Sequence, residues 1–527
     1  MPVARSGVTV TNWAETYSAT PRRYYEPESV EAVQAIVAAA AAERRVVKVV
    51  GSGHSPNDCV MTDDTVVSLR HLCRVLVVDL EARLVKVQAG ITLADLSEAL
   101  DRVGLALPNL GSISEQAFAG AIATGTHGSG LDYGALATTV VELQIVAGDG
   151  SLHTASRTSH PDLWAAARCS FGALGIVTAV VLQVVPAFDL EAVETPSTLP
   201  TVLAALPGRW RSAPYYRFWW FPHTDAVVEW HATPRPPHTA RPRRPRTCTP
   251  RWAAAHAGAL LRAVVGVHLY QVALWFALFV PRLIPWINAL WFTALFSYTR
   301  RQVDRSDRVF NFDCLFRQHV DEWAIPLESL PQAMAALKVM LDTSGHKAHF
   351  PVEVRPVPAD DTWLAPSAGR ASVYIGIIMY KPFGVECDYL AYFRQFEDLM
   401  LTFAGRPHWA KDFHLRGDAD FEPLYPHWHD FKRMRDAMDP AGVFANDFVR
   451  RTLGLPPAAP SDAPAAAAAH TSAAAAAASA AAAPVKPAGP PPARRTYAAA
   501  AAGTASTGTS GTHAPAPTIG AATLVHH

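Results

Sequence analysis

The chain has 527 residues, of which 46 are basic and 46 acidic, so its formal net charge is zero. Nucleic-acid-binding proteins normally carry a basic excess, and this balance argues against that class. The length is enough for two or three domains with their own cores. The six cysteines are scattered without metal-binding spacing, and the first 20 residues lack the apolar core of a secretory signal. We therefore expect reduced intracellular thiols and no metal site.

Residues 1–187 alternate short β-branched runs with glycine turns and short helical stretches, which predicts an α+β domain. Thr92 is placed to cap an amphipathic helix, and Gly148-Asp149-Gly150 is a hairpin signal. The predicted elements, in chain order, are a strand before the turn at Gly51, a strand at 83–90, a helix at 92–104, a hairpin at 139–156 and a buried strand at 171–186.

Residues 188–420 are richer in aromatic side chains and predict a second domain built on a sheet, with strands at 215–232 and 372–382. Residues 421–454 predict a short helical segment. From residue 455 to 527 the chain is Ala/Pro-rich with almost no large apolar residues. Such a tail buries too little surface to offset its ordering entropy, and we expect it to be disordered.

A hydrophobic insertion at 257–298 interrupts the second domain. Residues 263–280 form 18 consecutive uncharged residues, close to the lower limit for a membrane span, and Pro281 and Pro285 break the run. Three alternatives remain open: an apolar hairpin packed on the protein, an attachment to one membrane leaflet, and a full span. The tryptophans of the insertion suit a membrane interface, and we expect membrane attachment.

One short motif follows the first strand, "VVGSGHSPND" at residues 49–58. Glycines let a backbone approach phosphate closely, and successive N–H groups form an anion-binding concavity. The motif is not the dinucleotide fingerprint, because Pro56 stands where a third glycine belongs. Taken alone, His54 in this turn is better explained as a histidine that bonds to the backbone.

A second glycine-rich stretch, "LPNLGSISEQAFAGAIATGTHGSG", covers residues 107–130. Its small residues leave one side of the backbone nearly bare, which suits a large flat cofactor. The alternative is a loosely packed core helix. The small residues are Gly111, Gly120, Ala121, Ala123, Gly125, Gly128 and Gly130.

These two stretches together resemble the FAD-binding domain of the vanillyl-alcohol-oxidase (PCMH-type) flavoproteins. Three later motifs resemble the sugar-1,4-lactone oxidases within that group, and the fungal D-arabinono-1,4-lactone oxidases in particular. They are "FNFDCLF" at 310–316, "PVEVR" at 351–355 and "HWAK" at 408–411. The resemblance covers residues 15–454. It implies an FAD-binding domain at 1–187, a cap domain on an antiparallel sheet at 188–420, and a segment at 421–454 that returns to the FAD domain.

The resemblance also implies the cofactor and how it is held. In this family the histidine of the first motif, here His54, is bonded covalently to the 8α-methyl carbon of FAD. A glycine at the position of Gly111, rather than alanine, goes with oxidases, because one missing methyl leaves room for dioxygen. The cofactor-binding residues implied are His54, Gly51, Ser52, Gly53, Ser55, Gly111, Ser112, Ser114, Gly120, Ala121, Thr124, Gly125, His127, Gly128 and Ile176.

The catalytic residues implied are Glu353, Arg355 and Lys411. Glu353 and Arg355 are two apart in a strand and so lie on one face. Without the resemblance this pair is an ordinary surface ion pair. The resemblance places it in the substrate pocket, with Lys411 near the flavin. His408 and Asn446 are interpreted as structural.

The expected reaction is oxidation of an aldono-1,4-lactone at C2, followed by enolisation to an ascorbate-type enediol, with dioxygen reduced to hydrogen peroxide. D-arabinono-1,4-lactone is the first choice of substrate, ahead of L-gulono- and L-galactono-1,4-lactone. The alternatives are a cytochrome-c-linked dehydrogenase and, in another class, a catalytically inactive membrane-attached interaction protein. A mitochondrial membrane follows from the fungal resemblance alone.

Overall fold

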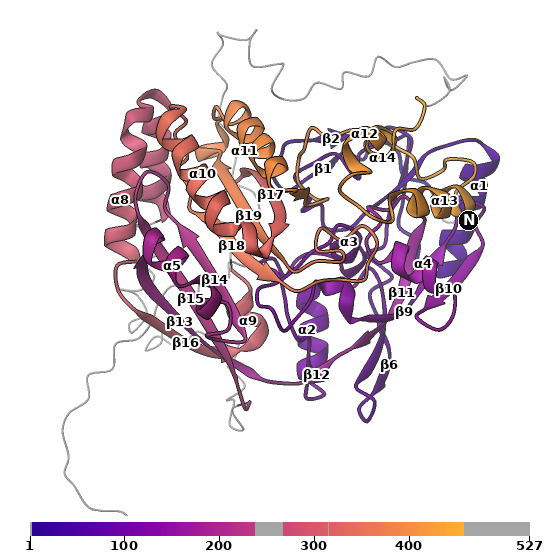
Figure 1. Ribbon diagram of the computed structural model, residues 1–527. Helices are drawn as coiled ribbons and strands as arrows, with labels where there is room; N and C mark the ends of the chain where they lie inside the picture. The colour runs from indigo at the N-terminus through magenta and orange to yellow at the C-terminus, as the bar shows by residue number, and fades with distance from the viewer. Residues whose placement is uncertain (1–2, 238–266, 313, 315, 458–527) are drawn as a thin grey trace, which may run out of the picture.

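The computed structural model describes residues 3–237, 267–312, 314 and 316–457. Nearly all of the predicted tail and the first ten residues of the insertion lie outside this part of the chain. Figure 1 shows the α+β architecture: the first part of the chain forms one half of the molecule, and an eight-stranded sheet with its helices forms the other. The predicted fold class is confirmed.

The N-terminal half contains a parallel sheet and an antiparallel sheet. The parallel sheet has the order β3-β5-β4 and carries the glycine turn at the end of β4. The antiparallel sheet has the order β10-β9-β11-β7-β6 and includes the predicted hairpin as β9 and β10. The strands are β3 (Arg23–Tyr25), β4 (Val47–Val50), β5 (Thr65–Ser68), β6 (Val75–Asp79), β7 (Leu84–Gln88), β9 (Val140–Val146), β10 (Leu152–Ser156) and β11 (Ile176–Gln183).

Four helices accompany these sheets. The Thr92 side chain accepts a hydrogen bond from the Asp95 N–H, so the predicted cap begins α2 as expected. Two short pairs of strands form separate small sheets: β1 (Val10–Thr11) with β2 (Ser18–Ala19), and β8 (Leu105–Ala106) with β12 (Val185–Pro186). The helices are α1 (Val30–Ala42), α2 (Leu93–Asp101), α3 (Phe118–Ala123) and α4 (Pro161–Ala167).

The second half is one antiparallel sheet in the order β16-β13-β15-β14-β18-β19-β17-β20. Neighbouring strands in the sequence are often separated in this order, so residues distant along the chain become direct neighbours. The strands are β13 (Asp189–Thr198), β14 (Tyr215–Trp220), β15 (Ala226–Arg235), β16 (Arg300–Arg305), β17 (Gln318–Pro326), β18 (Val352–Val357), β19 (Ser372–Tyr380) and β20 (Arg406–Pro407).

The two faces of this sheet have different chemistry because successive residues of a strand point to opposite sides. One face is apolar and packs with α10 (Leu330–Thr343) and α11 (Leu390–Thr402), whose buried side chains join Val354 and Ile375 in the core. The other face carries Glu353, Arg355 and their neighbours. It contacts the N-terminal half, where Arg355 donates a hydrogen bond to the Ser112 hydroxyl.

The C-terminal segment packs on the N-terminal half. The Phe171 ring lies 5.7 Å from that of Phe431 and 5.8 Å from that of Phe448. Asn446 caps the last helix through Val449 and donates from its amide to the Met61 carbonyl at 2.9 Å, which agrees with its predicted structural role. The helices of this segment are α12 (Gly417–Phe421), α13 (Trp428–Met438) and α14 (Asp447–Leu453).

The described part of the insertion is a helical hairpin made of residues 267–279 and α8 (Ile284–Leu295). Its inner side is packed on the protein: the Tyr270 hydroxyl donates to the His349 carbonyl at 2.6 Å, and the Asn288 amide donates to two backbone carbonyls. Among the described helices, none is long and apolar enough to cross a membrane. The small helices α5 (Leu199–Ala204), α6 (Leu206–Arg209) and α9 (Ser306–Phe310) complete this half.

Candidate active site

The two glycine-rich stretches meet at the end of β4. The Ser52 hydroxyl donates to the Glu115 carbonyl, and a Cβ on Gly51 would lie only 2.9 Å from the Ala117 Cβ. Gly53 has a φ of +69°, a conformation that glycine adopts at no steric cost. The tertiary structure thus brings together the two motifs that the sequence separates by about sixty residues.

His54 is half-buried in this turn. Its ring is stacked on that of Trp13, with centroids 6.3 Å apart. Its Nδ1 atom is buried and has no hydrogen-bond partner among the described residues. Burial lowers the pKa of His54, and the positive charges of Lys411 and Arg317 act in the same direction against the opposing charge of Glu115. The imidazole is therefore neutral near pH 7, with a ring nitrogen that the protein leaves unused.

The second stretch is less bare than its sequence predicts. A Cβ on Gly128 would overlap the Asn109 amide, and one on Gly130 would overlap the Pro214 carbonyl. A Cβ on Gly111 would lie 3.2 Å from the His127 carbonyl oxygen, while at Gly120 the space is open. Close packing against the protein itself therefore accounts for several of these glycines.

Two predicted cofactor-binding residues have buried side chains. The Ile176 side chain is 1% exposed and packs in a core cluster with Val146. Ala121 is buried within α3. Only the backbone of these two residues remains for a cofactor contact. Thr124 bonds back to the Gly120 carbonyl at 3.1 Å. Ser55 and Ser114 accept backbone or side-chain hydrogen bonds through their carbonyls.

The predicted catalytic pair lies on β18. The Glu353 carboxylate is 2.6 Å from the Arg355 guanidinium, which also bonds the Ser112 hydroxyl. Arg217, on the neighbouring strand β14, places a second guanidinium 3.9 Å from the other oxygen of Glu353. Glu353 Oε1, Arg355 Nε and Arg217 Nε are buried and have no hydrogen-bond partner among the described residues. A buried polar atom without a partner requires an explanation, and three of them on one polar face are consistent with a ligand that bonds there.

Arg217 was not predicted as a site residue. It lies among the rings of Trp230, Trp219 and Phe312, at 4.3, 4.8 and 5.1 Å. Burial and the nearby positive charge of Arg355 lower its pKa to about 9. The sequence did contain a signal: Arg217 is the single charged residue in the aromatic strand "YYRFWWF". A charge buried among aromatic side chains needs a polar or charged partner.

Lys411 is connected to the turn that carries His54. The Asn57 amide in that turn donates to the carbonyls of Trp409 and Lys411, at 2.8 and 2.9 Å. The backbone of the "HWAK" motif is thereby fixed beside the first glycine motif. The backbone of Lys411 is thus joined to the His54 turn, and Ser112 is joined to the Glu353–Arg355 pair.

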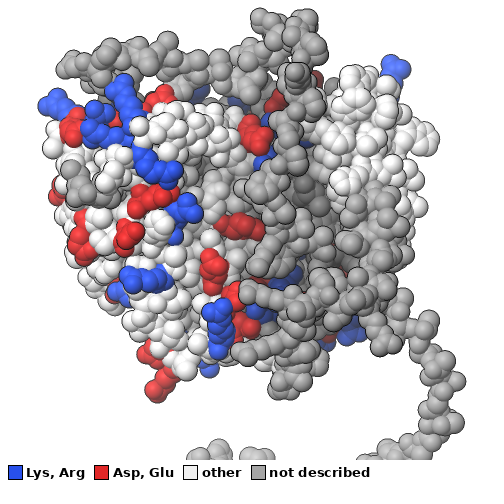
Figure 2. All heavy atoms as spheres, turned by 180° about the vertical axis from the view of Figure 1, so that it is seen from behind, with Lys and Arg blue, Asp and Glu red and all other residues white. Residues whose placement is uncertain are grey.

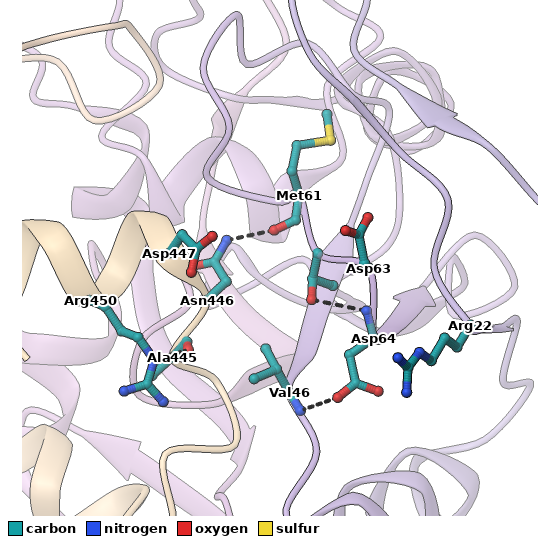
Figure 3. Close-up of a pocket in the computed structure, with 10 residues that line it drawn as sticks. Arg22, Val46, Met61, Asp63, Asp64, Ala445, Asn446, Asp447 and Arg450 are labelled. Atoms are coloured by element: carbon teal, nitrogen blue, oxygen red, sulfur yellow. Dashed lines mark hydrogen bonds between the residues drawn. The ribbon is translucent and has the colours of Figure 1, made fainter. Parts of the chain in front are cut away.

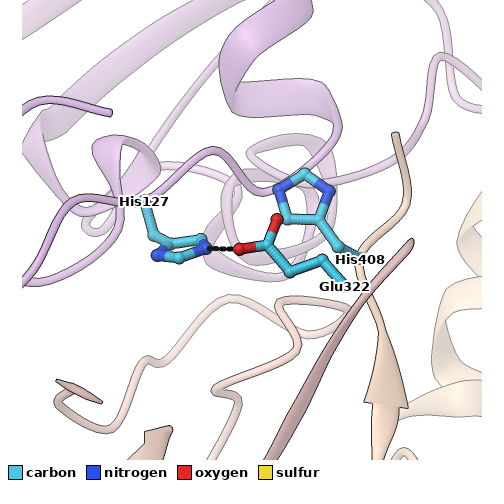
Figure 4. A group of neighbouring side chains, drawn as sticks. All are labelled: His127, Glu322 and His408. Atoms are coloured by element: carbon cyan, nitrogen blue, oxygen red, sulfur yellow. Dashed lines mark hydrogen bonds and ion pairs between the residues drawn. The ribbon is translucent and has the colours of Figure 1, made fainter. Parts of the chain in front are cut away.

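A second polar cluster consists of His127, Glu322 and His408 (Figure 4). The Nε2 atom of His127 lies 3.3 Å from Glu322 Oε1, and possible ligand atoms of all three residues lie within 4.8 Å of one another. Burial alone would raise the pKa of Glu322, but the hydrogen bond and charge of His127 outweigh it and hold the pKa well below its usual range. Burial lowers the pKa of His408 to about 3, so its ring is neutral. Sequence reasoning missed Glu322.

A surface cavity lies away from these residues. It has a volume of about 210 Å³, with Asp63, Asp64 and Arg22 on one side and Asn446 and Arg450 on the other (Figure 3). It lies where β4 and β5 begin, whereas the His54 turn lies where β4 ends. Ligands of open parallel sheets bind at the carboxyl ends of the strands, so this cavity is not the cofactor site.

The residues present fit FAD. A strand leads into a glycine turn with exposed backbone at Gly51 and Ser52, the neutral His54 ring has an unused buried nitrogen, and orphaned cationic groups lie on the facing sheet. The fold and this site define an FAD-binding oxidoreductase with a polar substrate site on the sheet of its second half.

Comparisons with known proteins agree with the assignment as an FAD-binding oxidoreductase. A family model for an FAD-binding domain matches residues 21–156, and one for D-arabinono-1,4-lactone oxidase matches residues 180–452. The chain is 42% identical to L-gulonolactone oxidase of Scyliorhinus torazame, over 85% of this chain and 98% of that protein. It is 30% identical to D-arabinono-1,4-lactone oxidase of Yarrowia lipolytica, over 83% and 95%. The chain belongs to the D-arabinono-1,4-lactone oxidase family of FAD-dependent oxidoreductases.

A solved structure extends the likeness in fold. Cholesterol oxidase from Brevibacterium sterolicum superposes with a TM-score of 0.64 over 86% of this chain and 97% of that one. The sequence identity is 15%, so this match concerns the fold alone.

Proposed function

We propose that this protein oxidises an aldono-1,4-lactone at C2 and passes the electrons to dioxygen, forming hydrogen peroxide. Two substrates are candidates. D-arabinono-1,4-lactone is the first choice from the sequence motifs, whereas the relatives named L-gulonolactone oxidase have the higher identities, 42% and 40% against 35% and 30%. Both lactones present ring hydroxyl groups to the same polar sheet face.

The observation that carries this proposal is the set of orphaned atoms around Glu353. A neutral polyhydroxy lactone offers hydroxyl donors for the free Glu353 oxygen and oxygen acceptors for the unpaired N–H groups of Arg217 and Arg355. Glu353 is positioned to accept the proton of the C2 hydroxyl, and Arg355 holds the carboxylate in place. Bound FAD would accept the hydride from C2. Lys411 adds positive charge beside the site.

The peroxide produced by purified protein tests this function. We expect turnover with at least one of three lactones, D-arabinono-, L-gulono- and L-galactono-1,4-lactone. Reduction of cytochrome c without peroxide would instead support a dehydrogenase. Protein that carries FAD and oxidises none of the three would contradict the proposal and favour the inactive interaction protein.

We further propose that His54 is bonded through Nδ1 to the 8α-methyl carbon of FAD. The support is a neutral ring whose Nδ1 is buried and unused. Acid-denatured protein should keep its yellow colour, and the band should fluoresce in a denaturing gel. His54→Ala should release all FAD to the supernatant, while the nearby variant His71→Ala keeps it. Release of FAD from the wild-type protein would contradict the tether.

Membrane association through the hairpin is proposed from its outer surface. The hairpin exposes a run of large apolar side chains, with Trp286 at 77% exposure, and the edge of the molecule that α8 forms shows little charge (Figure 2). A single leaflet is the fitting depth for a hairpin whose inner side is packed on the protein. A mitochondrial membrane is the proposed location. The exposed residues are Leu269, Val272, Phe276, Phe279, Val280, Leu283, Trp286 and Leu290.

Sedimentation with phosphatidylcholine vesicles at high salt tests this attachment. Wild-type protein should pellet with the vesicles, and the double variant Trp286→Glu/Leu290→Glu should remain in the supernatant. The control is Val77→Glu/Leu80→Glu, which places the same charges on another exposed apolar segment, and it should pellet like wild type. Equal pelleting of all three proteins would exclude the hairpin as the attachment.

A further inference from the structure

A row of residues crosses the polar face of the eight-stranded sheet. Glu353 on β18 lies directly opposite Gly376 on β19, and Gly376 lies directly opposite Glu322 on β17. Directly opposite residues of neighbouring antiparallel strands project from the same face. Glu353 and Glu322 therefore point the same way, two strand spacings or about 9–10 Å apart along the sheet.

Gly376 places no side chain between the two carboxylates. A Cβ at this position would lie 3.7 Å from Glu322 Oε1, an ordinary contact that the fold can accept. The glycine is thus not required by close packing. The two glutamates are also equally exposed, at 15% each, in a region where most neighbouring side chains are buried. Both carboxylates project from the same face of the sheet, on either side of Gly376.

The hydrogen bonds around Glu322 define its charge. His127 Nδ1 lies 2.9 Å from the Gly128 carbonyl, which only accepts, so Nδ1 carries a proton. His127 Nε2 lies 3.3 Å from Glu322 Oε1. The His127 ring is stacked on that of Tyr374, with centroids 3.6 Å apart. The hydrogen bond and charge of His127 outweigh the effect of burial and hold the pKa of Glu322 well below its usual range, so the carboxylate is ionised near neutral pH.

The same reasoning argues against a metal ion in this cluster. His408 Nδ1 accepts a hydrogen bond from the Ala410 N–H at 3.1 Å, so the neutral ring carries its proton on Nε2. That nitrogen has no lone pair left for a metal. The backbone N–H of His408 donates to the backbone carbonyl of Glu322 at 2.9 Å, which holds the His408 ring beside the Glu322 carboxylate.

We propose that Glu322, paired with His127, is a second hydroxyl-binding residue of the lactone site and selects for the side chain of the substrate. The inference rests on the proposed function. Glu353 and the two arginines hold the lactone ring at C2, and Glu322 accepts hydrogen bonds from the exocyclic hydroxyl groups across the space above Gly376. A six-carbon lactone has two such hydroxyl groups and a five-carbon lactone has one. Glu322 thus favours the six-carbon substrate.

The test compares L-gulono- and D-arabinono-1,4-lactone with Glu322→Gln, using peroxide release and the FAD absorption spectrum. We expect kcat/KM for the six-carbon lactone to fall about 10- to 100-fold, mainly through KM, since a charge-assisted hydrogen bond is lost. The five-carbon lactone should lose less than a third as much. The matched control Glu328→Gln, an exposed residue just beyond the same strand, should behave as wild type.

Gly376→Ala is the second variant, because it tests the open space without touching a charge. It should fold with unchanged thermal stability and full FAD content, yet raise KM for the six-carbon lactone more than for the five-carbon one. If Glu322→Gln fails to fold, the kinetics of Gly376→Ala alone test whether the side chain of the substrate binds beside Glu322.

Three outcomes would overturn the inference. Equal losses for both lactones would make Glu322 a structural residue, and unchanged kinetics in both variants would remove it from the site. In either case, active wild-type protein leaves the proposed function standing. Wild-type protein inactive on every lactone would refute the proposed function and this inference together.

Discussion

Two glutamates on one sheet face are held in contrasting ways. Glu353 lies between the guanidinium groups of Arg355 and Arg217, whereas Glu322 lies between the imidazole rings of His127 and His408. Both arginines are charged near neutral pH, even with the pKa of Arg217 lowered to about 9, while the charge of a histidine at that pH depends on its surroundings. Glu353 is thus always beside positive charge near neutral pH. The positive charge beside Glu322 depends on the protonation of its histidine neighbours, which their hydrogen bonds influence.

The largest expected effect separates the two glutamates by role. Glu353→Gln should lower kcat about 10²- to 10⁴-fold for every lactone, because it removes the group placed to accept the C2 proton. Peroxide release under saturating lactone measures this. A kcat within threefold of wild type would mean that Glu353 only binds substrate and that the two carboxylates do the same work.

Arg217→Met should lower kcat/KM about 10- to 100-fold while making the protein no less stable. Methionine keeps the contacts with Trp230 and Trp219, and it removes a guanidinium whose pKa burial lowers to about 9. Replacing a poorly compensated buried charge by an apolar group of similar size is often neutral or stabilising. Steady-state kinetics measures the loss in kcat/KM, and thermal unfolding measures the stability. A large loss of stability would show that Arg217 supports the fold rather than the ligand.

His127→Gln should make lactone binding sensitive to acid. Glutamine can still donate to Glu322 but carries no charge, so burial will move the pKa of Glu322 upward. As pH falls from 7 to 5, Glu322 gains a proton and KM should rise severalfold. In wild type the pKa of Glu322 is depressed, so KM should stay flat across this window. A flat KM in the variant would show that His127 does not maintain the charge.

The smallest effect concerns Asp412, next to Lys411. Burial, reinforced by the charge of Asp58, raises the pKa of Asp412 to about 7. Because the folded-state value exceeds the unfolded one, this group favours folding fully below about pH 4 and loses that contribution as pH rises through about 7. Between pH 4 and pH 8 the unfolding free energy of the wild-type protein should therefore decrease. In Asp412→Asn this decrease should be smaller by about 1–3 kcal/mol.

Urea unfolding of both proteins at the two pH values measures this difference. The Asp388→Asn variant, a carboxylate outside this buried group, should keep the wild-type pH dependence. Identical pH dependence in wild type and Asp412→Asn would show that Asp412 is not the group responsible.

The sequence predicted those helices and strands that depend only on residues close together in the chain. The helix capped by Thr92, the hairpin at Gly148–Gly150 and the strand with Glu353 and Arg355 depend on periodicity and turn chemistry within about ten residues. The site residues recognised in advance were those in such short motifs. The core packing of the Ile176 side chain was not predicted, because a short motif does not say which face of a strand meets which neighbour.

The sequence by itself determined the fold class, the glycine turn with His54, and the alternation that places Glu353 and Arg355 on one face. Only the tertiary structure decided which other residues lie beside them. Arg217 reaches Glu353 because β14 and β18 are neighbours, and Glu322 meets His127 and His408 because β17 lies beside β20 and faces the N-terminal half. Strand order and domain contact arise from burial of the whole apolar surface, which no short stretch of sequence encodes.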